Sequence, residues 1–139
     1  PIPIRMESEG IVKIISILNA LIQAFGNPSI CLAVDELDAG IFEYMLGELL
    51  DIFNKSAKGQ LIFTSHNLRA LEMLDKDNIM FSTVNPERRY IRMKNVKASN
   101  NLRDMYIRGI TLGGQDEVIY EETDSLRIAR AFRKAGRLA

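Results

Sequence analysis

The stretch ICLAVDE, residues 30–36, places two adjacent carboxylates directly after an apolar run. Five apolar residues in succession predict a strand buried on both faces, as in a parallel α/β sheet. Two carboxylates at the end of such a strand are costly to desolvate without a cation or hydrogen-bond donors nearby. Because ligands of open α/β sheets bind at the carboxyl edge of the strands, this stretch predicts a metal–phosphate site.

A second apolar run, QLIFTSHN at residues 60–67, ends in the only histidine of the chain, His66. Amphipathic helical spacing surrounds both runs, with Ser8 as the expected N-cap of the first helix. Alternating helices and strands imply right-handed crossovers and a parallel sheet. We therefore expect an α/β fold with a parallel core of about three strands, built from helices at 11–25, 41–54 and 67–74 and strands at 30–35, 60–64 and 79–84.

The remainder of the chain predicts smaller elements. A strand at 89–94 is expected to return antiparallel after a turn. One or two helical turns are expected at 102–108, a glycine-rich loop at 109–115 and a final helix at about 125–135. The 139 residues contain no stretch typical of an interdomain linker, so we expect one modest domain spanning residues 1–139.

Composition narrows the function classes only a little. Hydrophobic residues make up 47% and charged residues 26%, as in an ordinary globular domain. The formal net charge is zero, so global charge favours neither nucleic acid nor a membrane. The longest apolar stretches are far too short to span a bilayer and the first residues lack a signal-peptide pattern, so we expect no membrane association. The single cysteine, Cys31, lies in the expected buried strand and indicates a reducing, cytoplasmic location with an inert thiol.

Five residues are the candidates for carrying chemistry. A strand-end carboxylate such as Asp35 can hold Mg²⁺ against nucleotide phosphates, while Glu36 can activate the attacking water. His66 can donate a hydrogen bond to a terminal phosphate, and a single histidine argues against zinc. Ser8 and Gly10 lie where a helix begins, and the free backbone N–H groups there suit an anion. Solvated acids and a simple N-cap are the alternative interpretations of the same residues.

Several short motifs occur in an order that is typical of one protein family. In these motifs the chain resembles the carboxyl-terminal half of an ABC-type ATPase of the chromosome-maintenance, DNA-repair and phage-defence branch. It is similar in particular to the AAA-family ATPases of bacterial abortive-infection systems. The matching segments are Ser8-Glu9-Gly10 (signature motif), LAVDE at 32–36 (Walker B strand), LDAG at 37–40 (D-loop), IFTSHN at 62–67 (switch-histidine strand) and NLRDMY at 101–106 with Gly109 and Gly113-Gly114 (tail).

The resemblance implies a partial P-loop NTPase domain and roles for the residues at the strand ends. Asp35 would support Mg²⁺, Glu36 would be the general base, and His66 would sense the γ-phosphate of ATP. The implied cofactors are therefore ATP and Mg²⁺, and the implied reaction is Mg²⁺-dependent ATP hydrolysis.

The resemblance also implies a homodimer that forms on nucleotide binding. Ser8 and Gly10 would contact the γ-phosphate of a nucleotide held by the opposite subunit. Asp38 would link the two sites across a head-to-tail dimer. The expected further partner is DNA or a defence-system effector protein.

The chain departs from the family in three ways, the first being Ile41-Phe42-Glu43 in place of the Leu-His-Pro that often follows the D-loop. Glu9 stands where the signature motif usually has a glycine, and Glu7 precedes the serine, which places two carboxylates near the expected triphosphate. No G-x-x-x-x-G-K-[ST] phosphate loop occurs anywhere in the 139 residues. We therefore expect a fragment of the ATPase that is inactive when alone.

Two other function classes compete with the ATPase. One is a non-catalytic interaction module in which the Asp35-Glu36 pair is vestigial, and the missing phosphate loop favours it. The other is a TOPRIM-type metal nuclease that would use Glu36 and Asp38, but it requires a further strand-end glutamate upstream that the sequence does not show.

Overall fold

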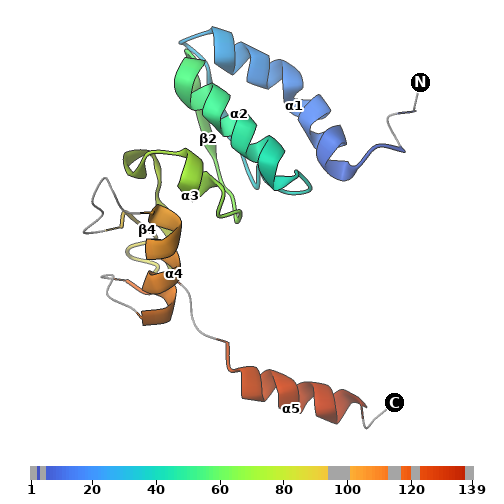
Figure 1. Ribbon diagram of the computed structural model, residues 1–139, viewed down its shortest axis with the longest axis vertical. Helices are drawn as coiled ribbons and strands as arrows, with labels where there is room; N and C mark the ends of the chain where they lie inside the picture. The colour runs from blue at the N-terminus through green and yellow to red at the C-terminus, as the bar shows by residue number, and fades with distance from the viewer. Residues whose placement is uncertain (1–2, 4–5, 94–100, 113–116, 120–122, 137–139) are drawn as a thin grey trace.

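The computed structural model describes residues 3, 6–93, 101–112, 117–119 and 123–136. Within these ranges the protein is a mixed α/β structure with one parallel and one antiparallel pair of strands (Figure 1). The expected α/β class is confirmed at this level. The elements are α1 (Glu9–Gly26), β1 (Cys31–Val34), α2 (Glu43–Ser56), β2 (Gln60–Phe63), α3 (Ala70–Met73), η2 (Lys76–Asn78), β3 (Phe81–Ser82), β4 (Tyr90–Ile91), α4 (Leu102–Leu112) and α5 (Ser125–Gly136).

The parallel pair β1–β2 confirms the strand–helix–strand unit that the two apolar runs predict. The strands align without offset from Cys31 opposite Gln60 to Val34 opposite Phe63, and α2 connects them. Because the ladder ends at Val34 and Phe63, the residues after both strands leave the sheet at one edge.

The expectation of a third parallel strand at 79–84 was wrong. Only Phe81–Ser82 of this segment forms a strand, and β3 pairs antiparallel with β4. The ladder is short because a tight turn follows it: the Thr83 hydroxyl donates to the carbonyl of Arg88 at 2.7 Å and accepts from the amide of Asn85 at 3.2 Å. The antiparallel return expected at 89–94 is confirmed at Tyr90–Ile91, and residue 94 lies outside the described ranges.

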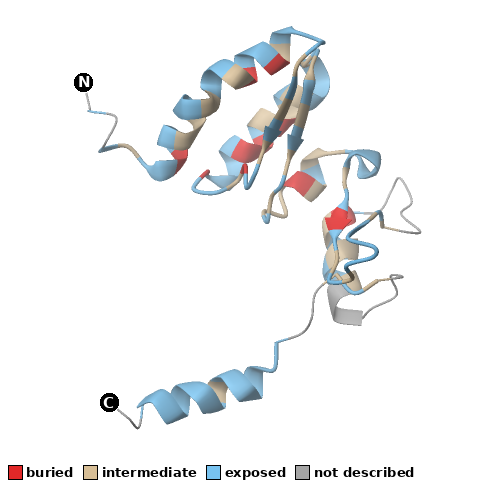
Figure 2. Cartoon of the chain, turned by 180° about the vertical axis from the view of Figure 1, so that it is seen from behind, coloured by how far each residue is buried: buried red, intermediate tan, exposed pale blue. Residues whose placement is uncertain are grey.

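The hydrophobic core lies on one side of the parallel pair. Its buried centre comes from the turn after β1, from α2 and from α3, and α1 contributes Ile14 and Ile17 from the same side. In Figure 1 α2 lies in front of the strands and α1 runs beside α2, and in Figure 2, seen from behind, the strands lie in front of α2. The fully or nearly buried members of the core are Leu37, Ile41, Leu46, Leu50 and Ala70.

Within the part of the chain that the structure describes, no element covers the opposite face of the parallel pair, which corrects the expectation of a strand buried on both faces. Exposed and half-buried residues alternate along both strands, and Ile62 keeps 59% of its surface exposed. Cys31 is exposed rather than a buried core thiol. The reason is that both long helices pack on the same face, so the alternate side chains of each strand have no described neighbour layer.

Helix α1 begins as expected. Ser8 is its N-cap, and the Ser8 hydroxyl accepts a hydrogen bond from the amide of Ile11 at 3.3 Å. The expectation that every apolar stretch is too short to span a bilayer was wrong for α1, which at 18 residues is long and apolar enough by length and composition. Core helices of globular domains and signal sequences can meet the same criterion; in this chain 17% of α1 is buried, and its Ile14 and Ile17 pack against the core.

The carboxyl-terminal elements partly follow the sequence pattern. Helix α4 runs from Leu102 to Leu112, so the loop expected at 109–115 was wrong for its first four residues, and residues 113–116, including Gly113-Gly114, lie outside the described ranges. Helix α5 is confirmed at Ser125–Gly136, and none of its residues is buried.

A carboxylate shared by two arginines joins α3 to α4. Glu72 accepts from Arg69 through Oε2 at 2.6 Å and from Arg103 through Oε1 at 2.7 Å. The Arg69 side chain also lies 5.9 Å from the centre of the Tyr44 ring and against Gly47, so it connects α3 to α2. The hydrogen bond from Arg103, followed by that from Arg69, lowers the pKa of Glu72.

The lowered pKa of Glu72 predicts a pH-dependent contribution to stability. A carboxyl with a depressed folded-state pKa stabilises the fold above its ordinary pKa of 4.5 and loses this effect as the pH falls through the lowered value. We expect Glu72→Gln to lower the Tm by about 3 °C at pH 7, with the difference shrinking below pH 4.5. Thermal unfolding of Glu72→Gln and of the wild type, measured from pH 7 to below pH 4.5, checks this prediction. Glu48→Gln, on an exposed position of α2, is the control. A difference that is constant with pH would contradict the assignment.

Candidate active site

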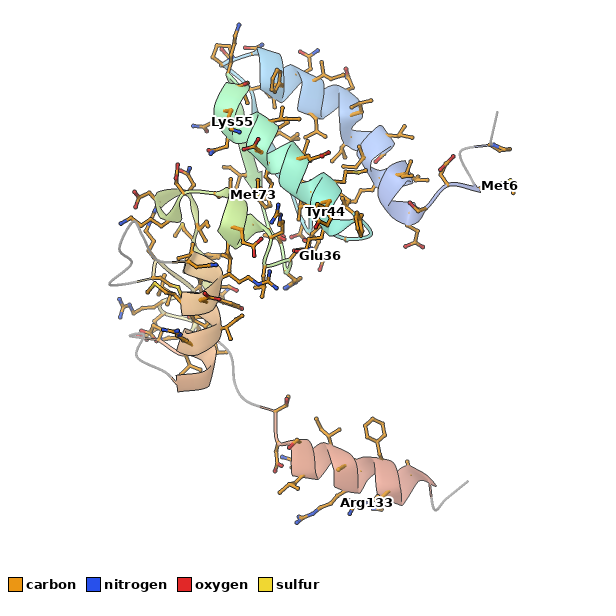
Figure 3. All side chains as sticks on the ribbon, viewed as in Figure 1. Met6, Glu36, Tyr44, Lys55, Met73 and Arg133 are labelled. Carbon is orange, nitrogen blue, oxygen red and sulfur yellow. The ribbon has the colours of Figure 1, made fainter. Side chains whose placement is uncertain are left out.

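The residues after β1 and β2 meet at the carboxyl edge of the parallel pair, as the sequence predicts. Glu36 lies at the end of the pair from which α2 starts (Figure 3). Its Oε1 atom is 3.9 Å from Nε2 of His66, and the two side chains are 60% and 88% exposed. The structure therefore brings together a carboxylate and an imidazole that are separated by 30 positions in the chain, both open to solvent.

Thr64 contacts both adjacent acidic residues, and sequence reasoning gave it no role. Its hydroxyl donates a hydrogen bond to Oδ1 of Asp35 and accepts one from the backbone amide of Glu36, at 2.7 Å for the second. The one available signal was its position directly after β2, opposite the carboxylate pair in the parallel register.

The turn after β1 is fixed by backbone contacts and by one buried side chain. The amide of Leu37 donates to the carbonyl of Thr64 at 2.9 Å, and the Leu37 side chain is fully buried. Glu36 has a φ of +46°, a left-handed conformation that is uncommon for a residue with a side chain. A strained conformation of this kind persists only where its neighbours enforce it, and here Leu37 and Thr64 do so.

Asp38 lies in the same cluster but has a partner within the chain. Its two carboxylate oxygens accept from the backbone amide of His66 at 3.3 and 3.2 Å. This contact fixes the backbone of the histidine segment to the turn after β1. The described geometry accounts for Asp38 through this local role, and the link between two subunits that the resemblance implies stays a prediction.

The start of α1 packs directly against the same turn. Gly10 is buried, and a Cβ atom built on it would lie 1.8 Å from the carbonyl oxygen of Gly40, whose φ is +74°. The Lys13 side chain donates to the carbonyl of Glu36, a contact that sequence reasoning also missed. Ser8 is exposed and its hydroxyl serves as the helix cap. Ser8 and Gly10 therefore have local structural roles beside the site, and their contact with a nucleotide stays a prediction.

The side chains fit a magnesium ion that is shared with phosphate, but not a metal held by protein alone. Among the residues that the structure describes, no group of three or more histidine, cysteine or acidic side chains could hold a metal. Mg²⁺ in nucleotide sites is usually bound by one or two carboxylates, substrate phosphates and water. Asp35 meets that requirement, because its hydrogen bond to Thr64 uses only Oδ1.

Comparison of the chain with protein-family models, with curated proteins and with solved structures found no match. The assignment of a function therefore depends on the residues at the carboxyl edge of β1 and β2 and on the order of the motifs that contain them.

Proposed function

We propose that this chain supplies the hydrolytic half of an ABC-type, P-loop ATPase domain. The observation that carries the proposal is the meeting of Asp35, Glu36 and His66 at one edge of a parallel strand pair. The three residue types are those that metal binding, water activation and phosphate contact require. The motif order around them, from Ser8 to His66, supports the same class.

In the proposed reaction each side chain has one task. Glu36, exposed and free of hydrogen bonds that the structure describes for its carboxylate, accepts the proton of the attacking water. His66, beside it, donates a hydrogen bond to the γ-phosphate. Asp35 would hold Mg²⁺, which when bound neutralises charge on the phosphates. Asp38 and Thr64 fix the backbone of the catalytic residues, because each accepts a hydrogen bond from an amide: that of His66 for Asp38 and that of Glu36 for Thr64.

The exposed face of the parallel pair is an argument that a further segment of the protein packs on this face. Parallel strands are normally covered on both faces, and an isolated two-stranded pair is marginally stable. Within the described ranges β1 and β2 pair only with each other, and Ile62 on this face is largely exposed. In this proposal the missing phosphate loop is carried by residues outside these 139, on a segment that completes the sheet.

The wider assignments rest on the resemblance alone. We propose that the assembled ATPase is cytoplasmic and forms a homodimer on nucleotide binding, with Ser8 and Gly10 of one subunit facing the nucleotide of the other. DNA or a defence-system effector is the proposed partner. Glu7 and Glu9 make the contact between Ser8 and a triphosphate the least favourable electrostatic element of this scheme.

The proposal predicts that the 139 residues alone do not turn over ATP. Asp35, Glu36 and His66 can act on a triphosphate only when a phosphate loop holds it, and the chain has none. Phosphate release from Mg-ATP by the purified chain should stay at the level of buffer. Sustained turnover by the chain would overturn the proposal that the phosphate loop lies outside these 139 residues. A coding sequence without a phosphate loop beside this segment would favour the non-catalytic interaction module.

A further inference from the structure

The Thr64 hydroxyl forms one hydrogen bond with each of two adjacent acidic residues, Asp35 and Glu36. The contact with Asp35 involves its carboxylate, whereas the contact with Glu36 involves its backbone amide. Asp35 is bound through its side chain, whereas Glu36 is bound only through its main chain and keeps its carboxylate free on this side.

The direction of the hydroxyl proton follows from elementary chemistry. A threonine hydroxyl has one proton to donate and lone pairs to accept with. The amide of Glu36 is a donor and cannot accept, so the hydroxyl oxygen must accept from it. The one hydroxyl proton is then available for Oδ1 of Asp35, which as a carboxylate can only accept.

We propose that Thr64 is a positioning residue that gives the two adjacent carboxylates different tasks. By donating to Asp35 it fixes one oxygen and directs the other outward for a cation. By accepting from the amide of Glu36 it holds that residue at its left-handed φ of +46°, which sets the direction of the Glu36 side chain toward His66. The catalytic part of this inference rests on the proposed ATPase function, whereas its conformational part does not.

The conformational part can be tested on the 139-residue chain by amide hydrogen exchange measured with NMR. Thr64→Val keeps the shape of the side chain but removes the hydroxyl, so we expect the Glu36 amide to exchange roughly fivefold faster. Thr64→Ser restores the hydroxyl and should restore the wild-type rate. If the Glu36 amide exchanges at the same rate in Thr64→Val as in the wild type, the proposal is overturned.

Thr83 provides a matched control for this measurement. Its hydroxyl also accepts from a backbone amide, that of Asn85, and donates to a backbone carbonyl, that of Arg88. Thr83→Val should therefore accelerate exchange at Asn85 and leave Glu36 unchanged. Faster exchange at Glu36 in both variants would show general loosening of the fold and would contradict a specific role for Thr64.

The catalytic part is tested in a longer protein that joins this chain to a phosphate loop. We expect Thr64→Val to lower kcat for ATP by about tenfold or more with little change in KM, and Thr64→Ser to recover most of the loss. A wild-type protein without ATP turnover would refute the proposed function while the exchange result stands. Turnover that is normal in Thr64→Val would refute the role of Thr64 while the proposed function stands.

Discussion

Replacing Glu36 by glutamine should reduce ATP turnover by a factor of about 10² to 10⁴ in a protein that joins this chain to a phosphate loop, the range that general acid–base catalysis contributes. Glutamine has the shape of glutamate but cannot accept a proton from the attacking water. The Glu36 carboxylate is 60% exposed and lies 3.9 Å from His66, so the change removes no buried contact. Phosphate release under saturating Mg-ATP measures the loss.

Two controls separate loss of the base from loss of the fold. The Tm of Glu36→Gln should equal that of the wild type, because the hydrogen bonds that fix this residue come from its backbone. Glu48→Gln removes a carboxylate from an exposed position of α2 and should leave turnover unchanged. Turnover of Glu36→Gln within twofold of the wild type would remove Glu36 from the mechanism.

Adding a single methyl group at Gly10 should be the most destabilising small substitution at the site. The Cβ of Gly10→Ala would lie 1.8 Å from the oxygen and 2.4 Å from the carbon of the Gly40 carbonyl, which are backbone atoms that cannot swing away. Gly40 itself holds a φ of +74°, so the turn cannot yield without losing its own conformation. We expect the free energy of unfolding in urea to fall by about 3 kcal/mol.

Gly26, in the same helix, is the matched control for Gly10. A Cβ added at Gly26 meets no atom within 4 Å, so Gly26→Ala should change the free energy of unfolding by less than about 1 kcal/mol, in the stabilising direction. Equal stability of the two variants would mean that α1 does not pack on the Gly40 turn as described. The comparison also shows whether Gly10 is required for folding, apart from any contact with a nucleotide.

The edge of the sheet that carries the candidate site could be predicted from the sequence, because the direction of the strands alone determines where their carboxyl ends lie. A parallel pair places both carboxyl ends at one edge, so Asp35, Glu36 and His66 had to approach one another once the two apolar runs paired in parallel. The helix cap at Ser8 was equally predictable, because a serine before an amphipathic run satisfies a free amide of the first turn.

Other features depend on contacts that no local pattern encodes. The apolar run before Asp35 indicated burial on both faces, yet Cys31 is exposed because α1 and α2 share one face of the sheet. The segment at 79–84 has strand-like composition, but the turn at Thr83 pairs it with β4 instead of the parallel sheet. Thr64, directly after β2, and Lys13, in α1, reach Glu36 only through the tertiary fold.

Phosphate release from Mg-ATP by a protein that contains both this chain and a phosphate loop is the most direct test of the proposed ATPase function. The proposed function predicts turnover that requires Mg²⁺ and that is absent when either the loop or residues 1–139 are removed. A protein with both parts intact that binds Mg-ATP and releases no phosphate would contradict the assignment of Asp35, Glu36 and His66 as its hydrolytic residues.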